Sequence, residues 1–233
     1  MKKYLFAAAL MLLSFASQAQ EIVVNQNLAD TAQKKRGPNL KVFRQSWIQL
    51  SFFTPFQNNA AQSFTGSYHL GIGHRVKYKL NRTFSWGWGL AFHFNHHRLK
   101  GVEVLANYPV SGSRKEKFLQ RQFAGELFFR TNFGKRGNVI GKFLDIGVSG
   151  GYNTWNTFRI VMDEKDLQGN KVAETTINLR KTNKAIPYSY GLIARIGINK
   201  FVISGEWRLS ELFKSEAALP ELSPMKIGIQ LGL

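Results

Sequence analysis

The stretch from Phe84 to Phe94 alternates strictly between large apolar residues and small or polar residues. One set is Phe84, Trp86, Trp88, Leu90, Phe92 and Phe94, and the other is Ser85, Gly87, Gly89, Ala91 and His93. A period of two predicts a β-strand with two unlike faces. The first set is too bulky for the interior of a narrow soluble barrel, and the second has no charged side chain to meet water. We therefore expect the aromatic face to meet lipid and the small face to line the interior of a transmembrane β-barrel.

Similar alternation recurs in seven further stretches: residues 47–53, 67–80, 119–133, 143–158, 186–198, 201–209 and 225–233. The connections after the second, fourth and sixth of these eight expected strands are short. The others are longer and polar, above all residues 98–117 and 159–184. Outer-membrane barrels have short periplasmic turns and longer external loops. The chain is therefore expected to be all-β, an eight-stranded antiparallel transmembrane β-barrel over residues 46–233, with both termini in the periplasm.

The first 45 residues differ in character from the rest. Lys2 and Lys3 precede an apolar run from Leu5 to Phe15, and Ser17-Gln18-Ala19 provides small residues around a cleavage position. This order predicts a secretory signal peptide over residues 1–19. Residues 20–45 are polar and irregular, so we expect a periplasmic lead-in. No long apolar run follows, which disfavours a helical membrane protein.

The composition is strongly basic and free of cysteine. The chain has 32 Lys+Arg and 14 Asp+Glu, and loss of Lys2 and Lys3 with the leader leaves 30 against 14, a net charge of +16. An exported protein rarely meets nucleic acid, so we expect no such partner. The anionic partner at an outer membrane is lipopolysaccharide, whose phosphates attract Lys and Arg. The candidate outer-rim contacts are Arg98, Lys100, Arg114, Lys115, Lys117, Arg180, Lys181 and Lys184. The alternative is an ordinary solvated face.

Charged residues also fall on the face expected to point inward. They are Arg75, Glu126, Arg130, Asp145, Arg195, Glu206, Arg208 and Lys226. Buried charges must pair, and an eight-stranded barrel is narrow enough for side chains to fill. We expect a salt-bridge network in which Arg75, Arg195 or Arg208 bridge Glu126 and Glu206. The alternative is a narrow channel, for which glycines at 71, 73, 87, 89, 147 and 151 would leave space.

Aromatic residues recur at the spacing of the two membrane interfaces. Tyr68 and Tyr78 are ten residues apart, which spans roughly 25 Å in a tilted strand, the height of the lipid-facing band. The expected aromatic girdle comprises Tyr68, Tyr78, Trp86, Trp88, Tyr188, Tyr190 and Trp207. His74 interrupts the apolar face of its strand, which predicts a local bulge or a neutral imidazole.

No catalytic, cofactor or metal site is expected. His93, His96 and His97 lie close in sequence, but His96 and His97 point to opposite faces of a strand and cannot easily share a metal ion. An enzyme that modifies lipid A would need Ser, His and an acid together on the lipid-facing surface, and the alternation brings no such set together.

The chain resembles the small outer-membrane β-barrel proteins of the Bacteroidota, the PorT-like barrel domain family. The resemblance rests on the leader ending at Ala19-Gln20, the turn from Asn132 to Asn138, the strand start Leu144-Asp145-Ile146-Gly147, and the closing strand from Pro224 to Leu233. It implies an integral outer-membrane barrel. The first hypothesis for its function is a structural or accessory role, as a membrane anchor or a component of an envelope or secretion assembly, with other envelope proteins as partners. One member of the family is implicated in type IX secretion. A narrow porin is the first alternative, and a lipid A-modifying enzyme is the less favoured one.

Overall fold

The computed structural model describes residues 38, 40–55, 62–100, 114–133, 139–165, 171–180, 184–217 and 219–233. The predicted signal peptide and most of the expected lead-in lie outside these residues. Within them, no helix has the length and apolar character needed to cross a membrane.

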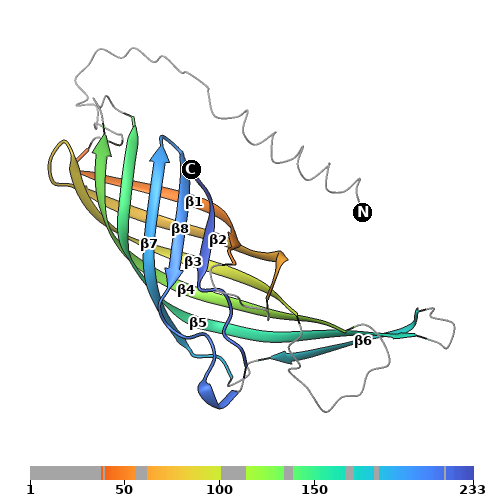
Figure 1. The fold of residues 1–233 in the computed structure, drawn as a ribbon. Helices are drawn as coiled ribbons and strands as arrows, with labels where there is room; N and C mark the ends of the chain where they lie inside the picture. The colour runs from red at the N-terminus through yellow and green to blue at the C-terminus, as the bar shows by residue number, and fades with distance from the viewer. Residues whose placement is uncertain are drawn as a thin grey trace, which may run out of the picture. The chain divides into compact units, whose positions relative to one another are not determined.

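Nine strands and one short 3-10 helix make up the described chain (Figure 1). The strands are β1 (Val42–Phe53), β2 (Gln62–Lys79), β3 (Phe84–Leu99), β4 (Arg114–Phe133), β5 (Lys142–Lys165), β6 (Lys171–Arg180), β7 (Tyr188–Ile198), β8 (Phe201–Arg208) and β9 (Met225–Gly232). The 3-10 helix η1 (Ser215–Ala217) lies in the connection between β8 and β9.

Eight of these strands close into an antiparallel ring. Strands β1 to β5 pair in chain order. From β5 the ring continues through β7, β8 and β9, and β9 pairs with β1 to close it. The eight-stranded antiparallel barrel expected from the alternation is thereby confirmed. The ninth strand, β6, lies outside the ring and pairs only with the far half of β5, so that the two form an arm beyond the barrel (Figure 1).

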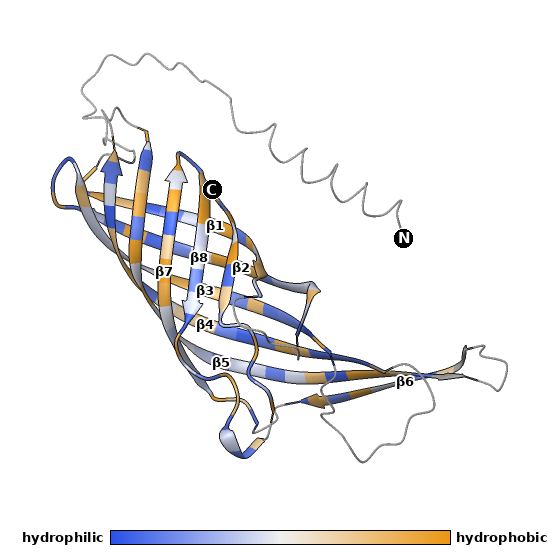
Figure 2. Cartoon of the chain, in the orientation of Figure 1, coloured by the Kyte–Doolittle hydropathy of each residue, from blue (hydrophilic) through white to orange (hydrophobic). Residues whose placement is uncertain are grey.

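The two faces of the barrel wall are inside out relative to a soluble protein. On β3, Ser85, Ala91 and His93 are buried, whereas Phe84 and Trp86 are exposed. The same holds around the ring, where alternating apolar and polar residues give the strands their banded colouring (Figure 2). Exposed apolar side chains on all ring strands form the continuous band that a lipid-facing wall requires. The orientation expected for the Phe84–Phe94 stretch is correct.

The polarity of the faces reverses towards the arm end of the barrel. In β4, Phe118 is fully buried inside, while Lys115 on the outer face is exposed. The inward side chains of this region pack with residues of the β8–β9 connection into one apolar cluster. We call this cluster the outer plug. Its buried members are Leu99, Phe118, Phe158, Ile160, Met162, Ala185, Leu212, Phe213 and Leu222. Apolar residues inside and charges outside are the pattern of a wall surrounded by water.

This reversal explains where the expected strands were too short. The segment 98–117 was expected to be a loop, but β3 runs to Leu99 and β4 begins at Arg114. The segment 159–184 was also expected to be a loop, and it contains the end of β5 and all of β6. The strands were predicted from bulky residues on the outward face, so each predicted strand ends where the bulky residues lie on the inward face instead. At the other end, β1 begins at Val42, inside the segment expected to be a lead-in, and its outward residues Arg44 and Ser46 are polar.

The short turns follow local side-chain chemistry. Asn199 in the β7–β8 turn has a φ of 55°, as expected for a tight hairpin. At the β2–β3 turn, the Asn81 side-chain oxygen accepts hydrogen bonds from the backbone N–H groups of Thr83 and Phe84. The bulge expected at His74 is absent, because β2 and β3 stay in register there. His74 instead lies exposed on the outer face, 3.1 Å from the hydroxyl of Ser46.

Candidate functional site

The interior of the barrel is crossed by buried ion pairs. Glu126 on β4 is held by two arginines: one carboxylate oxygen accepts from Nε of Arg75 at 2.8 Å, and the other pairs with Arg195. Asp145 accepts two hydrogen bonds from Arg130, at 2.6 and 2.8 Å, and lies 3.6 Å from Arg195. Arg195 therefore joins two ion pairs into one group, and all of its members are nearly or fully buried.

Two glutamines carry this network on to Glu206. Arg75 donates to the Gln230 side-chain oxygen at 3.0 Å, and Gln230 donates to Gln49 at 3.1 Å. Gln49 in turn donates to Glu206 at 3.0 Å, and Glu206 pairs with Lys226 at 2.9 Å. The connected side chains come from every strand of the ring except β3. Such a network fixes the strands relative to one another, because each buried charge depends on partners from other strands.

The network differs from the expected one in one member and in its links. Glu126 is bridged by Arg75 and Arg195, as the sequence predicts. Glu206, however, forms its ion pair with Lys226 and not with Arg75, Arg195 or Arg208. Arg208 does not belong to the network, since it pairs with Glu221 of the β8–β9 connection at 2.5 Å. The linking residues Gln49 and Gln230 were missed, although both occupy inward positions of alternating strands.

Large side chains fill the space opposite the lumen glycines. A Cβ atom on Gly73 would lie 2.5 Å from the indole of Trp47, and one on Gly87 would lie 2.5 Å from the ring of Phe128. The Phe128 ring is also approached by three guanidinium groups, those of Arg75, Arg130 and Arg195, at 5.4, 5.6 and 5.6 Å. Gly73 and Gly87 therefore make room for inward aromatic rings, and the space beside them is filled.

Apolar clusters occupy both ends of the lumen. The outer plug lies at the arm end, where Phe118, Phe158 and Phe213 pack with ring centroids 4.7 to 5.9 Å apart. At the opposite end, Ile140, Phe143 and Val202 form a second cluster, the inner plug, against which Phe43 packs. A cavity of about 70 Å³ remains between the outer plug and the network, with His93, Gln120, Glu206 and Lys226 among its lining residues.

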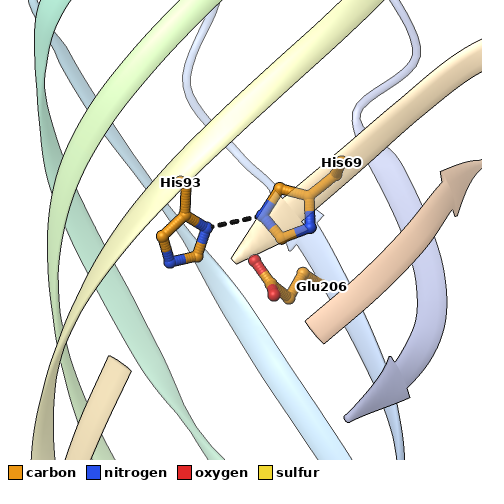
Figure 3. Close-up of side chains that lie close together, drawn as sticks. All are labelled: His69, His93 and Glu206. Atoms are coloured by element: carbon orange, nitrogen blue, oxygen red, sulfur yellow. Dashed lines mark hydrogen bonds between the residues drawn. The ribbon is translucent and has the colours of Figure 1, made fainter. Parts of the chain in front are cut away.

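Two histidines and one carboxylate, His69, His93 and Glu206, lie close together in the lumen (Figure 3). His93 and Glu206 also line the cavity. His69 on β2 and His93 on β3 face each other, with 2.8 Å between Nε2 of His69 and Nδ1 of His93. One nitrogen from each ring and an oxygen of Glu206 all lie within 4.8 Å of one another. His69 pairs across the strands with Asn95, and His93 pairs with Gly71. The two histidines are thus diagonal neighbours on the inward face, where long side chains can meet.

The histidines grouped by sequence are not grouped in space. His96 lies on the outer face, stacked on Tyr68 with ring centroids 4.8 Å apart. His97 is buried on the inner face, 3.2 Å from the Gln62 amide nitrogen. Their separation agrees with the alternation. The partner that sequence reasoning missed is His69, which could have been found by aligning inward positions of β2 and β3 across their short turn.

A groove with aromatic and basic lining lies on the outer face where the polarity reverses. Phe94, Arg121 and Trp155 are aligned across β3, β4 and β5, and the Arg121 guanidinium lies about 6 Å from both rings. Arg159 and Arg180 border the same groove, whose volume is about 560 Å³. Among the described side chains that line it, none is acidic. The groove therefore combines aromatic and apolar side chains with three arginines.

The expected outer-rim residues that the structure describes lie on the arm side of the barrel, with differing surroundings. Arg180 borders the groove, and Lys115 lies 3.7 Å from Asp163. Arg98, Lys100 and Lys184 are in described parts of the chain, and Lys117 is half-buried on the outer face. The side chain of Arg114 and all of Lys181 lie outside what the structure describes. Arg121 was missed, because an arginine inside a lipid-facing strand stretch was not counted with the rim.

The expected girdle residues all point outward. Tyr188 and Tyr190 are more than 60% exposed, and Tyr68, Trp86 and Trp207 are also exposed. Tyr78 and Trp88 are half-buried, and the ring of Tyr78 stacks on Trp86 at 4.8 Å. Tyr68 and Tyr78 lie near opposite ends of β2, at the arm side and the short-turn side respectively.

The fold and the filled lumen define the class of protein. A closed antiparallel ring of eight strands, apolar outside and polar inside, is a transmembrane β-barrel of the outer-membrane type. Comparisons with protein-family models and with curated protein sequences give no match. Among solved structures, the chain is similar to the crystal structure of Ail, the attachment invasion locus protein of Yersinia pestis. The two are 12% identical with a TM-score of 0.29, and the match covers 81% of this chain and 94% of that one. At this identity and TM-score, the likeness adds nothing to what the strand pairing establishes.

Proposed function

We propose that this protein is a non-conducting, non-enzymatic barrel of the outer membrane with a structural or accessory role, as an anchor or a component of an envelope assembly. The observation that carries the proposal is the closure of the lumen at three levels: the outer plug, the ion-pair network and the inner plug. A narrow porin would need a continuous aqueous path past all three. The resemblance to the PorT-like barrels supports the same role.

The test is the native size of the mature protein after mild detergent extraction from outer membranes, together with its conductance in planar bilayers. Recovery in a complex with other envelope proteins would support the accessory role. A single barrel without stable unitary current would support the anchor role. Stable unitary currents would overturn the proposal in favour of the porin. Loss of the heat-dependent shift in gel mobility, or absence from outer membranes, would contradict the barrel assignment itself.

We further propose that the groove at Arg121 binds the phosphorylated headgroup of lipopolysaccharide. Three arginines lie directly beyond the apolar band, and guanidinium groups bind phosphate in a bidentate manner. The aromatic rings of Phe94 and Trp155 offer an apolar surface to the first part of the acyl chains. The rim lysines add a longer-range attraction that falls with ionic strength.

This contact is tested with purified lipopolysaccharide and the protein in detergent, by titration at low and at moderate salt. The combined variant Arg121→Gln, Arg159→Gln, Arg180→Gln is expected to bind at least about tenfold more weakly, because it loses charge-assisted phosphate contacts. A matched control removes three exposed charges at the short-turn end: Arg44→Gln, Lys142→Gln and Lys200→Gln. Equal loss in both triple variants would show a nonspecific charge effect and refute the groove.

A further inference from the structure

We propose that His69, His93 and Glu206 form a binding site for a divalent transition-metal ion of the Zn²⁺ class inside the barrel. The two imidazole nitrogens and one carboxylate oxygen lie within 4.8 Å of one another and come from three different strands (Figure 3). Two imidazoles and a carboxylate are the ligand set of many zinc sites that keep a fourth position open.

Small side-chain shifts would bring the three groups to the distances of a metal site. In tetrahedral coordination with metal–ligand bonds of about 2.0–2.1 Å, neighbouring ligand atoms lie about 3.3 Å apart. The His69 and His93 nitrogens are 2.8 Å apart, so they would have to separate by only about half an ångström to share an ion. The Glu206 carboxylate is on a flexible side chain and would have to move closer.

A hydrogen bond between the two rings does not fully satisfy them. His69 is completely buried, and its Nδ1 has no hydrogen-bond partner among the described residues. A buried imidazole nitrogen without a partner is costly. Coordination through Nε2 would replace the hydrogen bond to His93 and fix the proton on Nδ1, so the metal–ligand bond must outweigh the cost of that buried donor. A water in the adjoining cavity could serve as a further ligand.

Lys226 acts as the competitor of the metal ion. Its ammonium group lies 2.9 Å from one oxygen of Glu206, and Gln49 donates to the other oxygen at 3.0 Å. A bound cation must share or displace the ammonium group. Lys226 borders the cavity between the outer plug and the network, and this gives its side chain space to move away. The site is therefore tuned by a positive charge whose removal should strengthen metal binding.

The test is Zn²⁺ binding to the full mature chain, folded in detergent and stripped with a chelator. We expect one ion per chain by calorimetry and elemental analysis. His93→Gln and Glu206→Gln should lower the affinity by about a hundredfold or more, since a ligand is lost. Lys226→Met should raise it. His96→Gln, which removes an imidazole on the outer face, should leave it unchanged.

Two results would overturn the site. One is a wild-type chain that binds no Zn²⁺, or whose binding is reduced by His96→Gln and retained in His93→Gln. The other is a wild-type chain with Co²⁺ that lacks the strong visible absorption of a tetrahedral site with nitrogen ligands. The cobalt spectrum needs no substitution, so the proposal is decided even if the lumen variants fail to fold. Conductance and native size do not enter, so the result is independent of the proposed structural role.

Discussion

The lumen residues are matched in size across neighbouring strands. Gly147 lies where a Cβ atom would be 2.1 Å from the backbone oxygen of Leu127 and 2.8 Å from Cα of Phe128. A backbone cannot move aside as a flexible side chain can. By contrast, a Cβ atom on Gly125, on the outer face of β4, would have no other atom within 4 Å. The two positions thus separate a glycine that packing requires from one that it does not.

Gly147→Ala is therefore expected to destabilise the barrel, whereas Gly125→Ala should be neutral. The first forces the paired strands β4 and β5 apart, and the second places a methyl group in lipid. The measurement is the temperature at which each folded variant loses its fast-migrating form on a denaturing gel. Equal transition temperatures for the two variants would contradict the close packing at Gly147.

The charge of Glu126 is equally dependent on its neighbours. Glu126→Gln leaves Arg75 and Arg195 buried without a full counter-charge, although Asp145 remains near Arg195. Removal of one partner from a buried pair costs about 3–5 kcal/mol. Lys115→Gln removes an exposed lysine that lies 3.7 Å from Asp163, and for such a long pair with a solvated partner about 0–1 kcal/mol is expected.

Urea unfolding of both variants, followed by tryptophan fluorescence, gives the two free energies. The comparison uses the same detergent and the same refolding conditions, because the reference state must not change. A loss below about 1 kcal/mol for Glu126→Gln would indicate that water reaches the network, which would favour the channel over the closed lumen.

At the scale of elements, the sequence was sufficient for the ring and insufficient for the arm. All eight ring strands follow from alternation, because each crosses the membrane with bulky residues outward. The outer ends of β3, β4 and β5 follow the opposite rule, with Phe118 and Phe158 inward and Lys115 outward. One rule applied along the whole chain cannot find both parts. β6 was missed for the same reason.

The candidate site also depended on information between strands. The inward charges could be identified from period two, but their partners are set by register and side-chain length. His69 and His93 are 24 residues apart, and only the pairing of β2 with β3 brings them together. Arg208 shows the converse, since an inward position near a strand end let it reach Glu221 in a connection.

The reversal of polarity predicts how the outer plug responds to truncation. Phe118 is fully buried and contacts the rings of Phe158 and Phe213. Phe118→Ala should cost about 3–5 kcal/mol, through lost burial and the cavity left behind. The neighbouring Lys117 points outward, so Lys117→Ala should change stability by less than about 0.5 kcal/mol.

Unfolding of the two variants by urea checks this expectation. Proteolysis of the folded barrels adds a local measurement, because a loosened plug exposes the β8–β9 connection to cleavage. If the Phe118→Ala variant were as stable and as resistant to proteolysis as Lys117→Ala, the outer plug would not contribute to stability as a packed apolar core.

At the scale of the whole molecule, the two ends of the barrel differ in length and charge. The short-turn end contains the Asn81 and Asn199 turns close to the apolar band. The arm end extends β4 over 20 residues and β5 over 24, more than the 9–11 that cross a bilayer. A long, basic extension and short turns together favour an orientation with the arm outside the cell.

Cysteine labelling can test this orientation, because the chain contains no cysteine. Lys115→Cys places a thiol on the exposed outer face of β4 at the arm end, and Lys200→Cys places one in the β7–β8 turn. With a membrane-impermeant maleimide on intact cells, Lys115→Cys should be labelled and Lys200→Cys should react only after the outer membrane is opened. A soluble periplasmic marker protein serves as the control for leakage. The reverse pattern would place the arm in the periplasm, where lipopolysaccharide is absent from the facing leaflet. The groove at Arg121 would then need another anionic partner, while the closed lumen and the histidine site would keep their expected properties.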